Sequence, residues 1–248
     1  MGLDGNDDWS PIAAEWALRW GGFARPAQLA ILDAAGPVAR LLDAGCGSGE
    51  LLRLAADRGA VVAGCDPSPA MLAIAARTAP EADLRMAGIE ALPWADGAFD
   101  AVTAVNALQF ADDGTAALRE VRRVLAPGGV VGIANWAERA RNDIDALEAA
   151  VADADDEPVP TDPPTRLAGG LEALLETQGL EIVAAGLVEA PWVAPDADSL
   201  VAGVLLGEDE ATLSVLGAEL LDAAAPFRTA TGGYRLVNHF RWALGRVR

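Results

Sequence analysis

The stretch LLDAGCGSGELLRLAADRGAVVAGCD, residues 41–66, contains the pattern that decides the fold of this chain. An apolar run ends at Asp43 and is followed by three glycines, Gly45, Gly47 and Gly49. A helical pattern comes next, and then a second apolar run that also ends in an aspartate. A glycine-rich turn between an apolar run and a helix predicts two parallel strands joined by a crossover helix.

The same alternation of short apolar runs and helical stretches continues along the first half of the chain. We expect strands at 40–44, 60–65, 83–86, 100–105 and 130–135, and helices at 49–58, 69–77 and 113–125. The second half predicts helices at 142–153, 169–178, 196–206 and 208–224, a strand at 180–190 and a last strand from 234. Strands that alternate with helices indicate a mostly parallel sheet with helices on both faces.

Composition excludes several classes of protein. The 248 residues are 52% hydrophobic and 22% charged, which is typical of a packed globular chain. The net charge is −19 and every basic residue is Arg, so the clustered positive charge that nucleic acids need is missing. No apolar run approaches the roughly 18 residues of a membrane span, and the acidic start lacks a secretory signal pattern. We therefore expect a cytoplasmic protein without nucleic-acid or membrane partners, its acidity serving solubility.

A metal site is not expected. The two cysteines, Cys46 and Cys65, form no CxxC pair, and the one histidine, His239, lies far away in the sequence. Both cysteines fall at the ends of predicted neighbouring strands. They are interpreted as buried small side chains, with a facultative disulfide as the alternative.

The glycine turn does not match a phosphate cradle. The dinucleotide pattern G-x-G-x-x-G fails because Glu50 stands at the third position, and no Gly-Lys-Ser/Thr follows as in a P-loop. The carboxylate of Glu50 would also repel a bound pyrophosphate, because both are negatively charged. S-adenosylmethionine fits better, because it carries a sulfonium and an ammonium group but no phosphate. Asp43 could attract the ammonium, and Asp66 stands where such folds bind ribose hydroxyls.

Four motifs in this order, DAGCGSG, GCDPSPAML, ALPWADGAFD and LAPGG, resemble the class I S-adenosylmethionine-dependent methyltransferases. The resemblance covers residues 35–136 clearly, and the branch it favours is the small-molecule one typified by ubiquinone and menaquinone biosynthesis. It implies a Rossmann-like, seven-stranded, mostly parallel α/β sheet with an antiparallel last strand and helical lid segments. It also implies S-adenosylmethionine as cofactor and S-adenosylhomocysteine as product.

We expect one methyltransferase domain over residues 1–248. Its parts would be an N-terminal helical cover at residues 1–35 and a cofactor-binding core at 36–136. Two lid or substrate segments would follow at 137–168 and 196–228, and the last strand at 234–247.

The resemblance also implies cofactor-binding residues at matching positions. The methionine-binding loop would be formed by Asp43, Gly45, Cys46 and Gly47, and the ribose-binding acid would be Asp66. The side chains flanking the adenine would be those of Pro67, Ser68 and Met71, and the adenine edge would lie at Gly88, Ile89 and Glu90. The residue at the sulfonium end would be Asn106. One departure concerns Gly88, because the family usually has an aspartate there that binds the adenine amino group. The loss of one such hydrogen bond weakens binding by about 0.5–1.5 kcal/mol.

The acceptor pocket is expected over the carboxyl end of the sheet. Its candidate residues are Trp16, Trp20, Gln109, Asn135, Trp136 and Tyr234, and Trp9 is compatible with the same aromatic stripe. No catalytic residue is assigned, because displacement at a sulfonium needs an aligned nucleophile more than acid–base chemistry. His239 is expected to be structural: Tyr234 opens the last strand at the ligand end, and His239 lies about 16 Å further along it.

The leading hypothesis is a methyltransferase that acts on O, N or C of a small, largely apolar molecule. A non-catalytic S-adenosylmethionine-binding protein and an enzyme using this cofactor for non-methyl chemistry are the alternatives. Either a monomer or a homodimer is compatible with the sequence.

Overall fold

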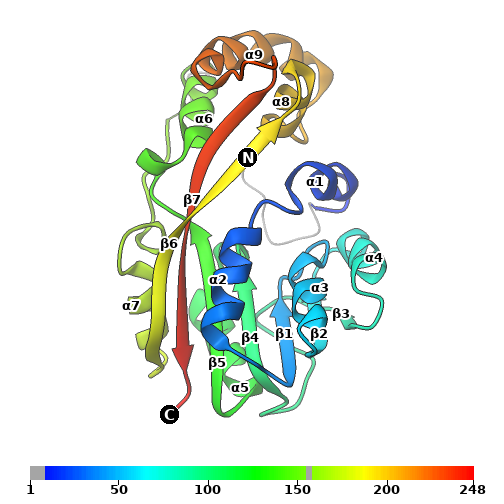
Figure 1. Cartoon of the computed structure of the whole chain (residues 1–248), viewed down its shortest axis with the longest axis vertical. Coiled ribbons are helices and arrows are strands. Elements are labelled where there is room, and N and C mark those ends of the chain that lie inside the picture. Colours follow the sequence, from blue (N-terminus) through cyan, green and yellow to red (C-terminus); the bar gives the residue numbers. More distant parts are fainter. Residues whose placement is uncertain (1–8, 155–157) are drawn as a thin grey trace.

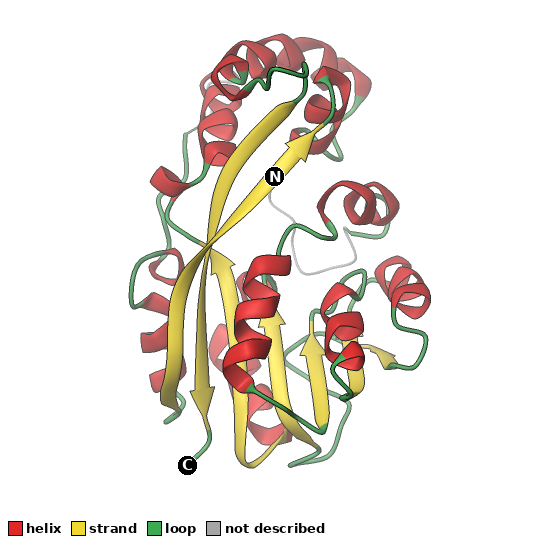
Figure 2. Ribbon diagram, in the orientation of Figure 1, coloured by secondary structure: helices red, strands yellow, loops and turns green. Residues whose placement is uncertain are grey.

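The computed structural model describes residues 9–154 and 158–248, and its centre is one seven-stranded sheet (Figures 1 and 2). The strand order is β3-β2-β1-β4-β5-β7-β6. Neighbours among the first five strands pair in parallel: β1 (Arg40–Ala44), β2 (Val61–Asp66), β3 (Asp83–Met86), β4 (Phe99–Val105) and β5 (Leu125–Trp136). The last strand, β7 (Tyr234–Arg246), is antiparallel to both β5 and β6 (Glu181–Ala194). The predicted mostly parallel sheet with an antiparallel last strand is confirmed.

Helices cover both faces of this sheet. One face carries α2 (Arg25–Ala35), α3 (Glu50–Asp57) and α4 (Pro69–Thr78), and the other carries α5 (Gly114–Val124) and α7 (Gly170–Glu176). Local chemistry explains where these helices begin. The Asp113 side chain accepts hydrogen bonds from the N–H groups of Thr115 and Ala116, and the Ser68 hydroxyl accepts from the N–H of Met71.

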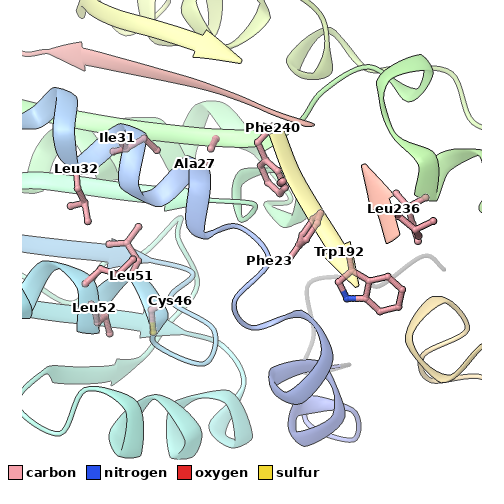
Figure 3. Packing of buried hydrophobic residues seen from close by; sticks show 14 of the residues in the cluster. Phe23, Ala27, Ile31, Leu32, Cys46, Leu51, Leu52, Trp192, Leu236 and Phe240 are labelled. Atoms are coloured by element: carbon pink, nitrogen blue, oxygen red, sulfur yellow. The ribbon is translucent and has the colours of Figure 1, made fainter. Parts of the chain in front are cut away.

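The core consists of two apolar layers, one on each side of the sheet. On the first, Ile31 of α2 and Leu51 of α3 pack towards the strands, and Figure 3 shows both together with Phe23 and Phe240. On the second, Leu118 and Val121 of α5 are buried at helical spacing. Because both faces of the central strands are buried, these strands are almost continuously apolar.

A long hairpin of β6 and β7 rises beyond the carboxyl end of the parallel strands (Figure 1). Trp136, the last residue of β5, pairs with Phe240, so residues 234–239 of β7 pair only with β6. The helices α6 (Asp143–Ala154), α8 (Ala197–Val204) and α9 (Glu210–Ala223) gather around the far part of this hairpin (Figure 1). The expectation that Tyr234 marks the ligand end of the sheet is wrong, because β7 begins six residues before it reaches β5.

The hairpin and β5 differ in length from the sequence prediction. β6 continues to Ala194 instead of ending at 190. β5 begins at Leu125, and the Pro127-Gly128-Gly129 segment that was expected to precede the strand lies within it, at a register shift against β4. Gly128 takes a φ of +75°, which glycine tolerates at such an irregularity.

The remaining elements are short. At the N-terminal side, α1 (Ala13–Trp20) precedes α2, and residues 1–8 of the expected helical cover lie outside the described residues. Single 3-10 turns occur at Leu108–Phe110, Arg139–Arg141, Pro164–Arg166 and Ala225–Phe227. Within the described ranges, no helix is both long and apolar enough to cross a membrane.

Candidate cofactor and acceptor site

The turn after β1 requires its glycines. Gly45, Gly47 and Gly49 have φ angles of +75°, +50° and +90°, a region that favours glycine. A Cβ atom on Gly45 would lie 2.5 Å from the Cβ of Ala107, and one on Gly49 would lie 3.0 Å from the Cα of Ala75. The turn is anchored below by the carbonyl of Cys65, which accepts from the N–H groups of Gly45 and Cys46 at 2.8 and 2.9 Å. The backbone is therefore packed closely against its neighbours and open towards the ligand side.

Asp66, at the end of β2, is held in place by this turn. Its two carboxylate oxygens accept hydrogen bonds from the N–H groups of Gly47 at 2.9 Å and Ser68 at 3.0 Å. The residue is buried and lines the cavity. Asp66 is thus both a fixed hydrogen-bond acceptor and a structural link between the turn and α4.

Asp43, at the end of β1, is buried next to two other acids. The Thr103 hydroxyl donates to its Oδ1 at 2.7 Å. Burial raises the pKa of Asp43 to about 7, the Thr103 hydrogen bond opposes the rise, and the charges of Asp66 and Glu50 add to it. Burial likewise raises the pKa of Glu50, whose carboxylate accepts from the Ser48 hydroxyl. The site concentrates negative charge that a cationic ligand would relieve.

A cavity of about 390 Å³ opens over these residues. Its walls come from the carboxyl ends of β1, β2, β4 and β5, from α1 and the start of α2, and from α6, α8 and β7. This is the edge at which open α/β sheets bind ligands. Of the predicted cofactor and substrate residues, those at the cavity are Asp43, Gly45, Cys46, Gly47, Asp66, Pro67, Met71, Gly88, Ile89, Glu90, Asn106, Trp16, Trp20, Gln109 and Trp136.

Asn106 occupies an unusual backbone position at the end of β4. Its φ of +55° makes it the one non-glycine residue with a positive φ in the described ranges. The Gln109 side chain donates to its Oδ1 at 2.7 Å, and its own N–H donates to the Ala134 carbonyl at 2.8 Å. A non-glycine residue held in this region is a frequent feature of functional sites. The side-chain amide is thereby fixed at the cavity wall.

The Gly88 position is partly filled by a neighbouring acid. A Cβ atom on Gly88 would lie 3.3 Å from Oε2 of Glu90. The other oxygen of Glu90 accepts a hydrogen bond from the N–H of Asp112 at 2.7 Å. The Glu90 carboxylate therefore lies beside the space that a side chain at position 88 would enter, and it is anchored at the same wall of the cavity.

Aromatic rings line the opposite part of the cavity. Ring centroids are 4.8 Å apart for Phe23 and Trp136, 5.2 Å for Trp136 and Phe240, and 6.5 Å for Trp20 and Trp136. Phe23 and Phe240 lie beside each other in Figure 3, with Trp192 next to them. Trp9 packs edge-on against Trp16 and Phe110, and Trp16 lies 3.9 Å from a Cβ atom built on Gly47. The predicted aromatic stripe thus forms one wall of the cavity and also packs against the protein.

Three predicted site residues do not line the cavity. Ser68 caps α4, and its hydroxyl lies 2.9 Å from that of Ser10. Asn135 accepts from the N–H of Trp136, so its side chain turns back on its own strand. Tyr234 is 4% exposed and pairs with Ala194 beyond the sheet edge. The Ser68 side chain therefore caps a helix, that of Asn135 bonds to its own strand, and that of Tyr234 is buried in the hairpin.

His239 also lies outside the cavity lining. Its Nδ1 is 2.7 Å from the carbonyl oxygen of Arg141, and its N–H donates to Oδ1 of Asn142. The expected structural role agrees with this geometry, although the reason given for it does not. His239 lies one residue beyond the carboxyl end of β5 in register, and its ring points away from the cavity because strand alternation gives that side to Phe240.

Sequence reasoning missed several residues of the cavity wall. Gln28, Ile144, Glu148, Val204 and Phe240 all line it, and they come from four separate elements. Phe240 is buried in β7, and no local pattern indicated that its face of the strand reaches the cavity. Ile144 and Glu148 lie one turn apart on α6, a helix whose placement depends on the hairpin.

The donor set of this site suits an organic cation and not a metal ion. Within the described residues, no group of three or more His, Cys, Asp or Glu side chains could hold a metal. Cys46 and Cys65 are free and buried, and burial raises the pKa of the Cys65 thiol to about 12. The turn amides and the carboxylates of Asp43 and Asp66 are groups that could bind the carboxylate, ammonium and ribose hydroxyls of S-adenosylmethionine.

Known proteins match the same part of the chain. Residues 42–133 match the family model described as a methyltransferase domain. An uncharacterised protein of Mycobacterium tuberculosis is 38% identical over 105 residues, which cover 41% of this chain and 38% of that protein. The demethylmenaquinone methyltransferase of Thermus thermophilus is 46% identical over 96 residues, covering 36% of this chain and 44% of the enzyme. The chain therefore spans less than half the length of these relatives.

Solved structures extend the likeness to the whole fold. One is a Thermotoga maritima protein described as an S-adenosylmethionine-dependent methyltransferase and possible histamine N-methyltransferase. It superposes with a TM-score of 0.58 at 17% identity, covering 98% of each chain. Such a low identity supports the fold alone. Residues 42–133 thus match a methyltransferase domain, and the chain as a whole shares the fold of the superposed structure.

Proposed function

We propose that this protein transfers a methyl group from S-adenosylmethionine to O, N or C of a small, largely apolar molecule. The observation that carries the proposal is one continuous cavity with two chemically different ends. The glycine turn lies at one end of the cavity together with Asp43 and Asp66. The aromatic wall with Trp136 and Phe240 lies at the other end. A polar cofactor and an apolar acceptor would thus meet within one enclosed space.

Each group of residues has a separate part in this proposal. Asp66 would hold the ribose hydroxyls, and Asp43 would pair with the ammonium group. Asn106, fixed by Gln109, would lie beside the sulfonium end. Bound there, S-adenosylmethionine supplies an electrophilic methyl group. The chain contributes the alignment of the acceptor and the exclusion of water, which together can supply much of the rate.

Thermal unfolding with S-adenosylhomocysteine, and with NAD as the control, tests the cofactor part. A ligand at a hundred times its Kd adds about 2.7 kcal/mol, which corresponds to about 5–10 °C for a chain of this size. We expect a shift with S-adenosylhomocysteine alone. The same shift with NAD, or none with either ligand, would contradict the proposed cofactor.

Asp66→Asn and Asp66→Ala separate ligand binding from support of the turn. The Asn variant keeps one oxygen that can accept from the turn amides, whereas the Ala variant removes both acceptors. We expect both to lose affinity for S-adenosylhomocysteine in calorimetry, and Asp66→Ala also to lower the melting temperature. Unchanged affinity in both variants would show that the ribose does not bind at Asp66.

Release of S-adenosylhomocysteine in the presence of candidate acceptors tests catalysis. The alternatives are a protein that only binds the cofactor and an enzyme that uses it for non-methyl chemistry. Methylated product together with equimolar S-adenosylhomocysteine supports methyl transfer. Tight cofactor binding without turnover across varied acceptors favours the first alternative, and a cofactor-derived product other than S-adenosylhomocysteine favours the second.

A further inference from the structure

Glu90 holds a carboxylate at the cavity wall just after β3. Its Oε1 accepts a hydrogen bond from the N–H of Asp112 at 2.7 Å, which fixes the side chain. Within the described part of the chain, Oε2 forms no hydrogen bond or ion pair. This second oxygen lies 3.3 Å from a Cβ atom built on Gly88, and both residues line the cavity. One oxygen thus anchors the carboxylate, and the other can accept from a ligand.

The order of the strands determines which part of the proposed cofactor would reach Glu90. β1, β2 and β3 are neighbours in the sheet. Asp43 lies near the carboxyl end of β1, and Asp66 ends β2 opposite Met86, the last residue of β3. The segment 87–90 follows Met86 directly and lines the cavity. With the ammonium group at Asp43 and the ribose at Asp66, the purine base is the part that would extend to this segment.

The surroundings of this segment suit a flat base with a polar edge. Met71 and Ile89 are 3% and 8% exposed, and both line the cavity together with Pro67. Such apolar side chains bury the faces of a ring, whereas an ionised carboxylate at its edge only accepts hydrogen bonds. Adenine presents a 6-amino group there, which is a donor. A 6-oxo purine presents a carbonyl oxygen instead, which would face the carboxylate without a hydrogen between them.

We infer that Glu90 is a specificity-determining residue, whose Oε2 accepts a hydrogen bond from the 6-amino group of the cofactor's adenine base. The inference rests on the proposed function, because the positions of the ammonium group and the ribose direct the base towards β3. The N–H of Asp112 orients the carboxylate, and the absence of a side chain at Gly88 leaves room for it. Adenine is thereby selected over purines that carry a 6-oxo group.

Two ligands that differ at the edge of the base test this assignment: S-adenosylhomocysteine, and S-inosylhomocysteine, in which a carbonyl oxygen replaces the amino group. Calorimetric titration into the full chain measures both affinities. We expect the wild type to bind S-adenosylhomocysteine about tenfold more tightly or better, which corresponds to one hydrogen bond to a charged group. Equal affinities for the two ligands would overturn the inference.

Glu90→Gln separates recognition of the base from support of the wall. Its side-chain oxygen can still accept from the N–H of Asp112, and its NH2 group donates where Oε2 accepted. We therefore expect about tenfold weaker binding of S-adenosylhomocysteine, tighter binding of S-inosylhomocysteine and an unchanged melting temperature. Equal weakening of both ligands would indicate a structural role and contradict the inference. Asp112→Asn, which removes a nearby exposed charge but keeps the backbone N–H, is the control and should keep the wild-type preference.

Gly88→Asp provides an independent test. The added carboxylate would crowd Oε2 of Glu90, so this variant should bind S-adenosylhomocysteine no more tightly than the wild type. The double variant with Glu90→Ala should bind it more tightly than Glu90→Ala alone, because the new carboxylate replaces the lost one. Binding that is several-fold tighter in Gly88→Asp than in the wild type would show that Glu90 does not serve the base, and would overturn the inference. A wild type that binds neither ligand contradicts the proposed function instead.

Discussion

At the scale of single residues, the glycine turn shows how one side chain would block the site. Gly45 combines a φ of +75° with a distance of 2.5 Å between its would-be Cβ and that of Ala107. The residue pattern alone predicted a glycine-rich turn between a strand and a helix here. It did not show that the neighbour is Ala107, because that residue follows β4 and not β1.

Gly45→Ala should therefore destabilise the protein by about 2–4 kcal/mol, from backbone strain and overpacking together. It should also abolish binding of S-adenosylhomocysteine, because the turn must shift. Gly59→Ala is the matched control: its φ is +90°, but no atom lies within 4 Å of an added Cβ. The control should lose only about 1–2 kcal/mol and bind normally. Equal stability loss and normal binding in both variants would show that contact with Ala107 is unimportant.

Asp43 makes the protein sensitive to pH. Its folded-state pKa is raised to about 7 from an ordinary value of 3.8, so the folded state binds more protons between these pH values. Stability contributed at this position therefore falls as pH rises from about 4 to about 7. Asp43→Asn removes the buried charge, and the melting temperature of the ligand-free variant relative to wild type should increase between pH 5 and pH 8. A constant difference would show that Asp43 does not titrate in this range.

Cofactor affinity should show the opposite trend. Only the ionised Asp43 can pair with the ammonium group, so affinity for S-adenosylhomocysteine should rise with pH up to about 7, by at most about tenfold per unit. In Asp43→Asn this dependence should disappear and the affinity should be lower throughout. Calorimetry between pH 5.5 and pH 8 measures both effects. A wild-type affinity that falls over this range would contradict the assigned role.

At the scale of elements, two tryptophans connect the N-terminal helix to the hairpin. Trp20 of α1 and Trp192 of β6 are stacked with centroids 4.5 Å apart. Each indole N–H donates across this contact, Trp20 to the carbonyl of Gly203 and Trp192 to that of Arg19. The spacing of Trp16 and Trp20 predicted one helix face, and the structure shows that this face closes the cavity and holds α8 as well.

Trp192→Ala should cost about 3–5 kcal/mol, because a buried indole is removed. The amides of α1 should then exchange hydrogen faster than those of α5, which lies on the opposite face of the sheet. Trp192→Phe keeps a ring but loses the hydrogen bond to Arg19, so its effect on both measurements should be smaller. Unchanged exchange in α1 with Trp192→Ala would show that the helix is held by other contacts.

At the scale of the whole molecule, the main feature is the excess of negative charge. The chain has 37 acidic and 18 basic residues, and most of its described ion pairs lie at the surface, where each contributes little. Repulsion among the excess carboxylates opposes the compact state and is screened by salt.

We therefore expect thermal stability to rise between 0.1 M and 1 M NaCl, with a midpoint shift of about 2–4 °C for each kcal/mol of repulsion relieved. KCl should act in the same way, and an uncharged solute at equal osmolality should not reproduce the effect. A melting temperature that falls with salt would show that surface ion pairs outweigh the repulsion.

The sequence by itself determined the parallel sheet, the crossover helices and the glycine-turn end of the cavity. These depend on short-range physics: strand and helix periods, helix caps, and glycines whose φ angles only that residue tolerates. Asp43, Asp66 and Asn106 could be placed because each directly follows, or ends, a predicted strand. Only the tertiary structure decided the acceptor end. Gln28, Trp136, Glu148 and Phe240 come together because the hairpin of β6 and β7 extends beyond β5, with α6 packed on β7 and α8 packed on β6. Strand register is a long-range property, set by packing between segments about a hundred residues apart in sequence, and no local pattern encodes it.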